Sequence, residues 1–361
     1  MKTEWLRQTI RDFEPYKVPE IQEHTIINAN ESPYNILDFP SVREDFLKGL
    51  AELKSYRYPD PFAEDLRKAL AEYVQCRPGQ ILATNGGDET ISLILNTFIN
   101  PGDTVLVHAP TFDIYGIDAT VLGARVVHVP DDDGYCRSAE KLQQAIADMQ
   151  PKVTFVCNPN NPTGSIWPVS VIETLLQTAD NIVVVDEAYL EFSGQDSVIP
   201  LMEQYDNLIV IRTLSKAFGL AGFRLGYGVA REDVIDALSL TKLSYNLNSV
   251  TQLMGCVAMK HRDEVLGHNI PPTIENRDYL ERELNGFDGV TAYPSASNFI
   301  LVRVPDGPEL IGAMKDADIC VRFYSAKDLQ NCIRLTVTTR DVADRILAVF
   351  RSLYKEVARR A

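Results

Sequence analysis

Short apolar runs separated by longer amphipathic stretches constrain the fold of this chain more than any other feature of its sequence. Such an alternation indicates a parallel β-sheet whose strands are joined by crossover helices. Because the runs are almost wholly apolar, we expect helices to cover both faces of the sheet. The sequence therefore predicts an α/β fold with a large, mostly parallel seven-stranded sheet, whose expected strands are residues 81–84, 104–107, 125–129, 153–157, 182–185, 208–211 and 225–229.

The pattern changes after about residue 246. Two helix-like stretches, 252–261 and 274–284, are followed by four short expected strands and a last helix over about 342–358. This order is typical of an α+β domain. A chain of 361 residues is also long enough for about two domains. We therefore predict an N-terminal arm over residues 1–26, a large domain over 27–246 and a smaller α+β C-terminal domain over 247–361.

Charge and composition exclude several classes of function. A formal net charge of -15 repels phosphate backbones, so neither nucleic acid nor an anionic membrane surface is an expected partner. The first residues are interrupted by charges, and no apolar run is long enough to span a bilayer. The six cysteines show no pairing pattern, and the five histidines show no metal-ligand spacing. We therefore expect a cytoplasmic protein without a metal site.

Polar residues follow several predicted strands, at the sheet edge where open α/β folds bind ligands. Residues 85–90 (NGGDET) begin a helix, and glycines there expose N–H groups to an anion. Asn161 lies in a proline-rich turn, residues 158–164 (NPNNPTG). Asp186 ends another strand, where a buried carboxylate needs a partner such as a protonated pyridine nitrogen. A helix cap, a plain turn and a capping or metal-binding aspartate remain the alternative interpretations.

Lys216 lies in a glycine-punctuated, mostly apolar segment, residues 213–224 (TLSKAFGLAGFR). A desolvated lysine has a lowered pKa and can form a Schiff base with an aldehyde. Thr213, Ser215 and Arg224 suit a phosphate group, and an aldehyde beside a phosphate suggests pyridoxal phosphate. A solvated surface lysine in a glycine-rich turn is the alternative.

Two arginines near the end of the chain, Arg322 and Arg334, lie in or beside apolar strands. A partly buried guanidinium favours a carboxylate or a phosphate, which it can hold with two parallel hydrogen bonds. A structural ion pair is the alternative for either residue.

Four motifs, in this order and at these spacings, resemble the class I/II aminotransferases of pyridoxal phosphate fold type I, and the resemblance covers nearly the whole chain. These motifs are residues 161–164 (NPTG), 186–189 (DEAY), 215–216 (SK) and 222–224 (GFR). Within that group, three further segments look like those of histidinol-phosphate aminotransferases, namely residues 28–34 (NANESPY), 56–60 (YRYPD) and 86–89 (GGDE).

The resemblance implies a role for each matching residue. Lys216 would be the Schiff-base lysine, Asp186 the partner of the pyridine nitrogen, and Asn161 and Tyr189 the donors to the phenolate oxygen of the ring. Lys216, Asp186 and Tyr189 would be the catalytic residues. Phe112 matches a position, commonly tyrosine, whose ring stacks on the pyridine. The residues expected around the cofactor phosphate are Gly87, Asp88, Thr213, Ser215 and Arg224.

The resemblance also implies a substrate and an assembly. Arg334, with Arg322, Tyr16 and Asn30, would bind the substrate, and in histidinol-phosphate aminotransferases the arginine grips the substrate's phosphate. A tyrosine at the position of Tyr58 reaches the cofactor phosphate across a dimer interface, which implies a homodimer. The expected reaction moves the amino group of L-histidinol phosphate to 2-oxoglutarate, through the cofactor pyridoxal 5'-phosphate.

Other functions remain open on the same scaffold. A threonine-phosphate decarboxylase also binds a phosphorylated amine compound, but it breaks a carbon–carbon bond. An aromatic or broad amino-acid aminotransferase is possible because one arginine can hold a carboxylate or a phosphate. A non-catalytic scaffold or regulatory protein is a remote alternative, since function depends on the site and not on the fold. No nucleotide-binding glycine motif supports a nucleotide-dependent enzyme.

Overall fold

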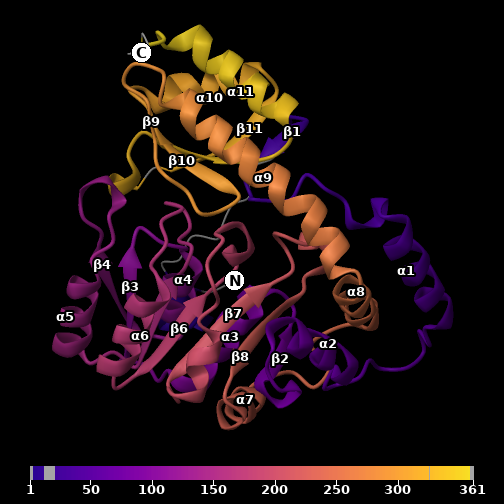
Figure 1. Cartoon of the computed structure of the whole chain (residues 1–361). Coiled ribbons are helices and arrows are strands. Elements are labelled where there is room, and N and C mark those ends of the chain that lie inside the picture. The colour runs from indigo at the N-terminus through magenta and orange to yellow at the C-terminus, as the bar shows by residue number, and fades with distance from the viewer. Residues whose placement is uncertain (1–2, 12–20, 325, 358–361) are drawn as a thin grey trace.

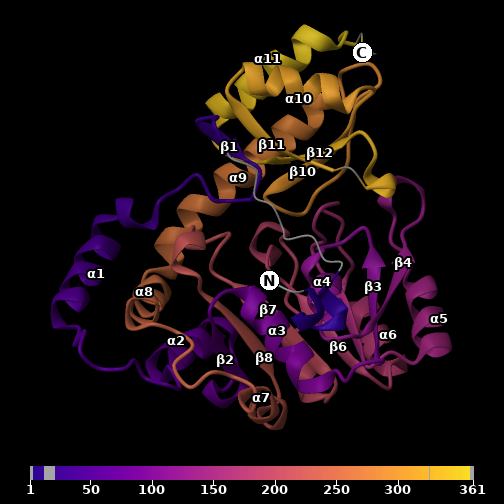
Figure 2. The same ribbon diagram turned by 180° about the vertical axis from the view of Figure 1, so that it is seen from behind.

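The computed structural model describes residues 3–11, 21–324 and 326–357. A larger part, built on a wide sheet, lies below a smaller part that contains the C-terminal helices (Figure 1). Figure 2 shows the same two parts from behind, with the first described residues in front of helix α4 (Ile114–Val121). The Thr9 hydroxyl donates to the carbonyl of Val121 over 2.9 Å, so this segment of the expected N-terminal arm does lie against the larger part.

The large sheet has seven strands within the described residues, and it confirms the predicted α/β fold. Its strand order is β2-β8-β7-β6-β5-β3-β4. The neighbours from β7 to β4 are parallel, while β8 runs antiparallel to both β7 and β2. The strands are β2 (Ile81–Thr84), β3 (Thr104–Ala109), β4 (Arg125–Pro130), β5 (Val153–Cys157), β6 (Ile182–Asp186), β7 (Leu208–Thr213) and β8 (Gly226–Ala230).

Both faces of this sheet are buried because successive side chains of a strand point to opposite sides. In β6, Val183 and Val185 enter one apolar core, whereas Val184 enters the other. Helices α3 (Gly87–Phe98), α4 and α7 (Glu232–Ser239) supply the core on the Val184 side. The opposite core receives side chains from α2 (Glu64–Val74), α5 (Ala139–Met149), α6 (Val169–Thr178) and α8 (Ser249–Lys260).

The smaller sheet has the order β1-β11-β12-β10-β9 within the described residues. A separate apolar core lies between this sheet and three helices. The strands are β1 (Thr25–Ile27), β9 (Thr291–Ala292), β10 (Phe299–Arg303), β11 (Ile319–Phe323) and β12 (Cys332–Thr336), and the helices are α9 (Arg262–Leu284), α10 (Gly307–Asp316) and α11 (Arg340–Leu353).

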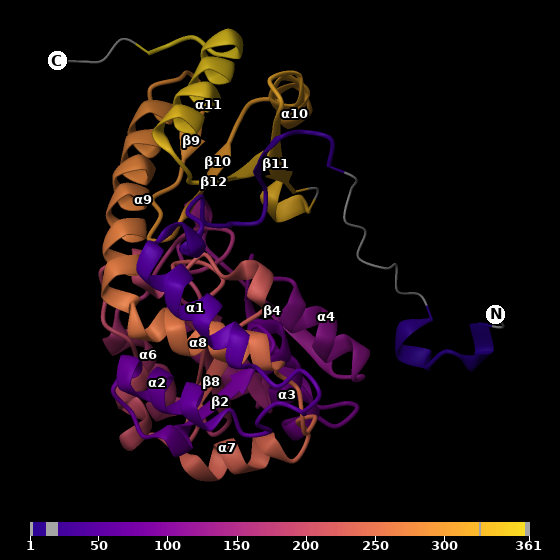
Figure 3. The same ribbon diagram turned by 90° about the vertical axis from the view of Figure 1, so that its right-hand side faces the viewer.

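Two elements pack in a different part of the molecule from the one to which the predicted domain limits assign them. Strand β1 pairs in parallel with β11 and so joins the smaller sheet from the other end of the chain. Helix α8 packs on α2 and on α1 (Pro40–Glu52), because its Met254 and Val257 are buried in the core of the large sheet. Helix α9 runs from the larger part into the smaller one (Figure 3). We therefore propose that the domain boundary lies within α9 and not at residue 247.

Candidate active site

The polar side chains that follow the parallel strands lie at one edge of the large sheet. Asp186 is the last residue of β6, Thr213 is the last residue of the neighbouring β7, and Gly87 begins α3 just after β2. Arg334, on β12 of the smaller sheet, donates to the side chain of Asn161, which follows β5. The smaller sheet therefore meets the large sheet at the edge where ligands bind in open α/β folds.

The Asp186 carboxylate is buried and held by two donors. The Tyr115 hydroxyl of α4 donates to Oδ2 over 2.6 Å, and the backbone N–H of Ala188 donates to Oδ1 over 3.0 Å. Burial raises the pKa of Asp186 to about 6, although both hydrogen bonds act in the opposite direction. A cation beside the carboxylate would restore a lower pKa. The site is therefore suited to a protonated ring nitrogen.

Tyr189 joins two asparagines beside this carboxylate. Its hydroxyl accepts a hydrogen bond from Nδ2 of Asn30 over 3.1 Å and another from Nδ2 of Asn161 over 3.4 Å. Burial raises the pKa of Tyr189, so the hydroxyl keeps its proton near neutral pH. With both amides donating to its oxygen, that proton can be donated to a phenolate-type oxygen of a ligand.

The Lys216 amine lies over this group. Its Nζ is 5.8 Å from the centre of the Tyr189 ring and donates to the carbonyl of Ala29 over 2.9 Å. Burial, and then the positive charge of Arg334, lower the pKa of Lys216 to about 8. A much larger fraction of the amine is therefore neutral at pH 7 than in an ordinary lysine, and only the neutral amine can attack an aldehyde.

A glycine turn and an arginine form a cradle for an anion at the start of α3. Gly86 precedes the helix with φ of 86°, and an added Cβ there would lie 2.6 Å from Nη2 of Arg224. A Cβ on Gly226 would lie 2.5 Å from the backbone nitrogen of Gly87, so β8 approaches the turn as closely as glycine allows. Helix N-termini hold free N–H groups and favour anions.

Charged and hydroxyl side chains surround the cradle. Nη2 of Arg224 donates to Oδ2 of Asp88 over 2.8 Å. The Thr213 hydroxyl donates to Oγ of Ser215 over 2.9 Å, and the backbone N–H of Ser215 donates back to Thr213 over 3.1 Å. All the residues expected around the cofactor phosphate thus lie at neighbouring ends of α3, β7 and β8.

Arg334 is buried and points toward the same group. Its Nη1 donates to Oδ1 of Asn161 and its Nη2 to the carbonyl of Asn28, both over 2.6 Å. Its guanidinium carbon is 5.5 Å from the centre of the Phe299 ring. No partner for its buried Nε occurs among the described residues. A donor without a protein partner in a buried site is available to an anionic ligand.

The remaining predicted residues are placed by other contacts, or lie beyond the described part of the chain. The Phe112 ring meets the Tyr115 ring edge to face, with centroids 5.5 Å apart. Arg322 lies directly opposite Arg334 in the β11 and β12 pairing. The Tyr58 side chain is 79% exposed and stacks on Tyr245 instead of turning into the site of its own chain. Tyr16 lies outside the described residues.

Sequence reasoning missed the partners of the predicted residues. Tyr115, which donates to Asp186, lies only three residues after Phe112, and this closeness in sequence to a predicted ring-stacking residue was the one available signal. The carbonyl groups of Asn28 and Ala29, which accept from Arg334 and Lys216, carry no side-chain signal at all.

A sequence model described as aminotransferase class I and II matches residues 24–350. This chain belongs to the class I and II aminotransferases. It is 36% identical over 353 residues to a histidinol-phosphate aminotransferase of Caldanaerobacter subterraneus, covering 96% of this chain and 98% of the relative. It is 38% identical over 347 residues to one of a Thermoanaerobacter species, covering 95% of this chain and 96% of that relative.

The fold of this aminotransferase is also similar to that of solved relatives. A crystal structure of a histidinol-phosphate aminotransferase from Sinorhizobium meliloti, in complex with pyridoxal-5'-phosphate, superposes with a TM-score of 0.87 at 25% identity. It covers 97% of this chain and 98% of its own. The chain is therefore a pyridoxal-phosphate-dependent aminotransferase of fold type I.

The residues of this aminotransferase fit pyridoxal phosphate. An aldehyde, a ring nitrogen and a phosphate need an amine with a lowered pKa, a buried carboxylate and an anion cradle. Lys216, Asp186 and the Gly86–Gly87 turn with Arg224 supply these three groups at one sheet edge. Within the described residues, no three histidine, cysteine, aspartate or glutamate side chains are grouped so as to hold a metal ion.

Proposed function

We propose that this aminotransferase transfers the amino group of L-histidinol phosphate to 2-oxoglutarate. The observation that carries the proposal is the buried Arg334 guanidinium, which donates to Asn161 through Nη1 and lowers the pKa of Lys216, while its Nε has no partner among the described residues. A guanidinium is the side chain best matched to a phosphate group. The curated relatives, named histidinol-phosphate aminotransferases and aligned over nearly the whole chain, support the same substrate.

The arrangement of Arg322 and Arg334 supports an anionic substrate. The two residues are directly opposite each other in the β11 and β12 pairing, so their side chains leave the same face of the sheet. Like charges in such a pair repel each other, and a phosphate between them would remove the repulsion. Asn30, buried and bonded to Tyr189 over 3.1 Å, would border the same end of the substrate. The predicted role of Tyr16 remains a proposal.

When bound, pyridoxal phosphate supplies an electron sink that stabilises negative charge on the substrate carbon. The Asp186 carboxylate would hold a proton on the ring nitrogen, and the Tyr189 hydroxyl and the Asn161 amide would donate to the phenolate oxygen. Phe112 would stack on the ring. Its own ring contacts Tyr115, and the Tyr115 hydroxyl donates to Asp186, so Phe112 lies close to the residue that would bind the ring nitrogen. The phosphate would be held by Gly87, Asp88, Thr213, Ser215 and Arg224.

Lys216 would move the proton. With its pKa lowered to about 8, Nζ could accept a proton from the substrate carbon and donate it to the aldehyde carbon of the cofactor, because a group whose pKa is near the working pH exchanges protons readily. The carbonyl of Ala29, which accepts from Nζ over 2.9 Å, would hold the amine between transfers.

We also propose a homodimer. Exposed apolar side chains gather around Tyr58 and Tyr245, whose rings stack with centroids 4.4 Å apart. Nζ of Lys242 donates to the carbonyl of Pro61 over 3.1 Å, which ties the two segments into one patch. Such a patch favours association. Its members, with exposed fractions of at least 49%, are Tyr56, Tyr58, Phe62, Leu240, Leu243 and Tyr245.

A cytoplasmic location completes the proposal. All six cysteines are free thiols, as expected in a reducing compartment. None of the helices in the described ranges combines the length and the apolarity that a bilayer crossing requires.

The experiment that tests the proposed reaction is a coupled assay of the purified protein with L-histidinol phosphate and 2-oxoglutarate. We expect stoichiometric glutamate, and no glutamate from Lys216→Ala. Release of carbon dioxide without glutamate would instead support a decarboxylase. A higher kcat/KM with an aromatic amino acid than with the phosphorylated amine would support a broad aminotransferase.

A further inference from the structure

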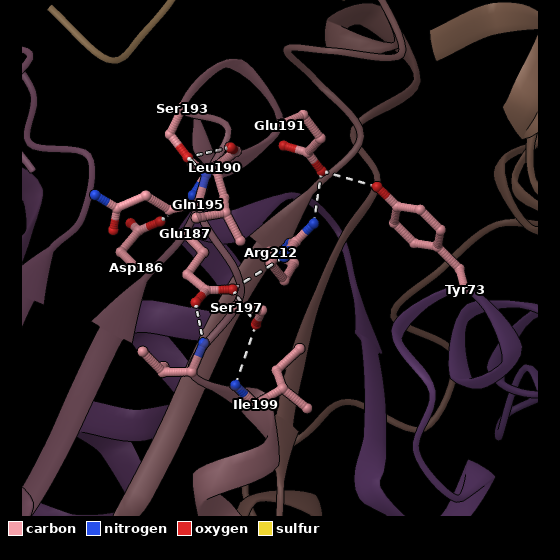
Figure 4. A network of polar contacts seen from close by, with 12 residues as sticks. Tyr73, Asp186, Glu187, Leu190, Glu191, Ser193, Gln195, Ser197, Ile199 and Arg212 are labelled. Atoms are coloured by element: carbon pink, nitrogen blue, oxygen red, sulfur yellow. Dashed lines mark hydrogen bonds and ion pairs between the residues drawn. The ribbon is translucent and has the colours of Figure 1, made fainter. Parts of the chain in front are cut away.

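A buried ion cluster lies behind the candidate active site, and its centre is Arg212 of β7. Nη1 of Arg212 donates to Oε2 of Glu187 over 2.9 Å, and Nη2 donates to Oε1 of Glu191 over 2.7 Å. The three side chains are between 1% and 6% exposed. Figure 4 shows the guanidinium between the two carboxylates, each of which has further partners.

The cluster is adjacent in sequence to the proposed catalytic residues but lies on the opposite side of the sheet. Asp186 bonds Tyr115 of α4 on one face, and because side chains alternate, Glu187 points to the other face. At the end of β7, Thr213 likewise points to the face of Asp186, whereas Arg212 points to the face of Glu187. The ladder continues past β6 here, since the N–H of Glu187 donates to the carbonyl of Ile211 over 2.9 Å.

One guanidinium thereby holds both ends of the turn that carries Tyr189. Glu187 precedes this turn, and Glu191 lies in the short helix Leu190–Phe192 that ends it. The same guanidinium is anchored on β7, three residues before Ser215. Two side chains that the proposed function needs, Asp186 and Tyr189, are therefore fixed relative to the strand that leads to Lys216.

Each carboxylate of the cluster is also tied to an outer element. Glu187 accepts from the Ser197 hydroxyl over 2.7 Å and from the backbone N–H of Val198 over 2.8 Å. Glu191 accepts from the Tyr73 hydroxyl, at the end of α2, over 3.2 Å. These bonds fix the positions of the two carboxylates. The guanidinium, which binds both, then fixes the position of the turn between them.

A contribution to stability alone does not explain this arrangement. Burying three charges costs several kcal/mol per ion, and replacing such a cluster by apolar residues is often neutral or stabilising. The cluster even has an excess of one negative charge when all three groups are ionised, and Nε of Arg212 and Oε2 of Glu191 have no partner among the described residues. Orienting side chains around a ligand is the function for which buried polar shells are retained.

We propose that Arg212 is a positioning residue, which holds the turn from Asp186 to Glu191 so that Asp186 and Tyr189 meet the cofactor ring. This inference rests on the proposed roles of these two side chains, but it does not depend on which amine the enzyme uses. Removing the guanidinium would also leave the charge of Glu187 uncompensated next to Asp186, whose pKa Glu187 already raises.

The test compares Arg212→Met and Arg212→Lys with the wild type as folded holoenzymes. Lysine can reach only one carboxylate at a time, so cofactor affinity should fall in the order wild type, Arg212→Lys, Arg212→Met. We expect Arg212→Met to weaken pyridoxal phosphate binding about tenfold, the smaller effect typical of residues that orient the ligands of a site. Arg212→Lys should lie between this variant and the wild type. Cofactor affinity is measured by reconstituting apoprotein and following visible absorbance.

Two further readouts separate positioning from a general loss of stability. The pH titration of the bound cofactor's visible absorbance should shift in Arg212→Met, and kcat should fall while KM changes little. The matched control is Arg262→Met, which removes a more exposed ion pair, one with Glu72 on the same helix α2 and not with a residue of the turn. This control should retain the wild-type affinity and titration.

Milder variants keep the test decisive if Arg212→Met does not fold. Glu191→Gln keeps an acceptor for the guanidinium, and Tyr73→Phe removes only one hydroxyl, so each should weaken cofactor binding about two- to threefold, in keeping with the loss of one modest hydrogen bond. A folded Arg212 variant with wild-type affinity, titration and kcat would overturn the proposal, as would milder variants without effect. A wild type that binds cofactor but does not convert L-histidinol phosphate would refute only the proposed substrate.

Discussion

The Asn161 amide bridges the two parts of the molecule, because its oxygen accepts a 2.6 Å hydrogen bond from Arg334 of the smaller sheet while its nitrogen donates to Tyr189 of the larger part. The group proposed to bind the substrate and the group proposed to bind the cofactor thus share one side chain. A change at Arg334 should therefore affect substrate binding first and the cofactor only secondarily.

Arg334→Lys should raise the KM for L-histidinol phosphate by about 10- to 100-fold, equivalent to the 1.5–3 kcal/mol typical of hydrogen bonds to a charged group. Lysine keeps the charge but cannot hold a phosphate with two parallel N–H bonds. Steady-state kinetics measures the change. Arg303→Lys, on neighbouring β10, is the control, since Arg303 donates to Tyr135 away from Lys216. An unchanged KM in Arg334→Lys would show that the phosphate does not meet this guanidinium.

The rate at which apoprotein takes up pyridoxal phosphate should rise with pH around a midpoint of about 8. The lowered pKa of Lys216 means that the neutral, reactive amine forms above this pH. Because the charge of Arg334 contributes to the lowering, Arg334→Gln should move the midpoint upward. Stopped-flow absorbance between about pH 6 and pH 10, a range that brackets the expected midpoint and approaches the ordinary lysine pKa of about 10.4, measures the uptake rate of both proteins. A midpoint near the ordinary lysine pKa would contradict the lowered pKa of the Lys216 amine.

Asp186→Asn should abolish transamination yet stabilise the apoprotein at neutral pH. Burial raises the folded-state pKa of Asp186 from 3.8 to about 6, so the folded state binds the proton more tightly than the unfolded state. The stability from this group is complete below the unfolded pKa and is lost as pH rises through about 6. The loss is about 3 kcal/mol for a shift of this size.

Urea unfolding of both apoproteins at several pH values measures this difference. The wild type should lose stability relative to Asp186→Asn between about pH 4 and pH 7, and the two curves should be parallel above that range. Tyr115→Phe removes a hydrogen bond to the ionised carboxylate, so this variant should lose more stability over the same pH range than the wild type does. Parallel curves over the whole range would mean that the carboxyl group is not desolvated.

Leu243→Glu should convert the proposed dimer into a monomer, since burying a charge within an apolar interface has a large desolvation cost. Leu243 is 74% exposed in the single chain and lies in the patch around Tyr58. Sedimentation equilibrium measures the change. Trp5→Glu alters a side chain that is similarly exposed, at 73%, but outside the patch, and it should leave the dimer intact. A monomeric wild type would refute the assembly.

The sequence identified residues whose position follows from a strand end. Asp186, Thr213 and Gly87 follow apolar runs that are easy to recognise, and the geometry of parallel sheets brings such residues to one edge. The identity of Lys216 as the reactive amine depended on the family motif, because an exposed lysine in a glycine-rich turn has the same local sequence.

Contacts between distant segments could not be predicted in this way. Tyr115 and Asp186 are 71 residues apart, and Arg212 and Glu187 are 25 apart, so no periodic pattern connects them. Helix α8 was predicted to begin the C-terminal domain, but its Met254 and Val257 lie in the core of the large sheet, and an apolar helix face does not itself indicate which core it enters. Strand β1 pairs with a strand nearly 300 residues later, as the 294-residue separation of His24 and Asp318 shows.

Helix α9 has a consequence for motion within the enzyme. Its first turns bury Val265 in one core and its last turns bury Leu280 in the other, so the helix is anchored in both parts of the molecule. Pro271 and Pro272 lie between these anchors, where their missing N–H groups remove backbone hydrogen bonds and make bending easier. A rotation that carries Arg334 toward or away from Lys216 would therefore pivot at this pair of prolines.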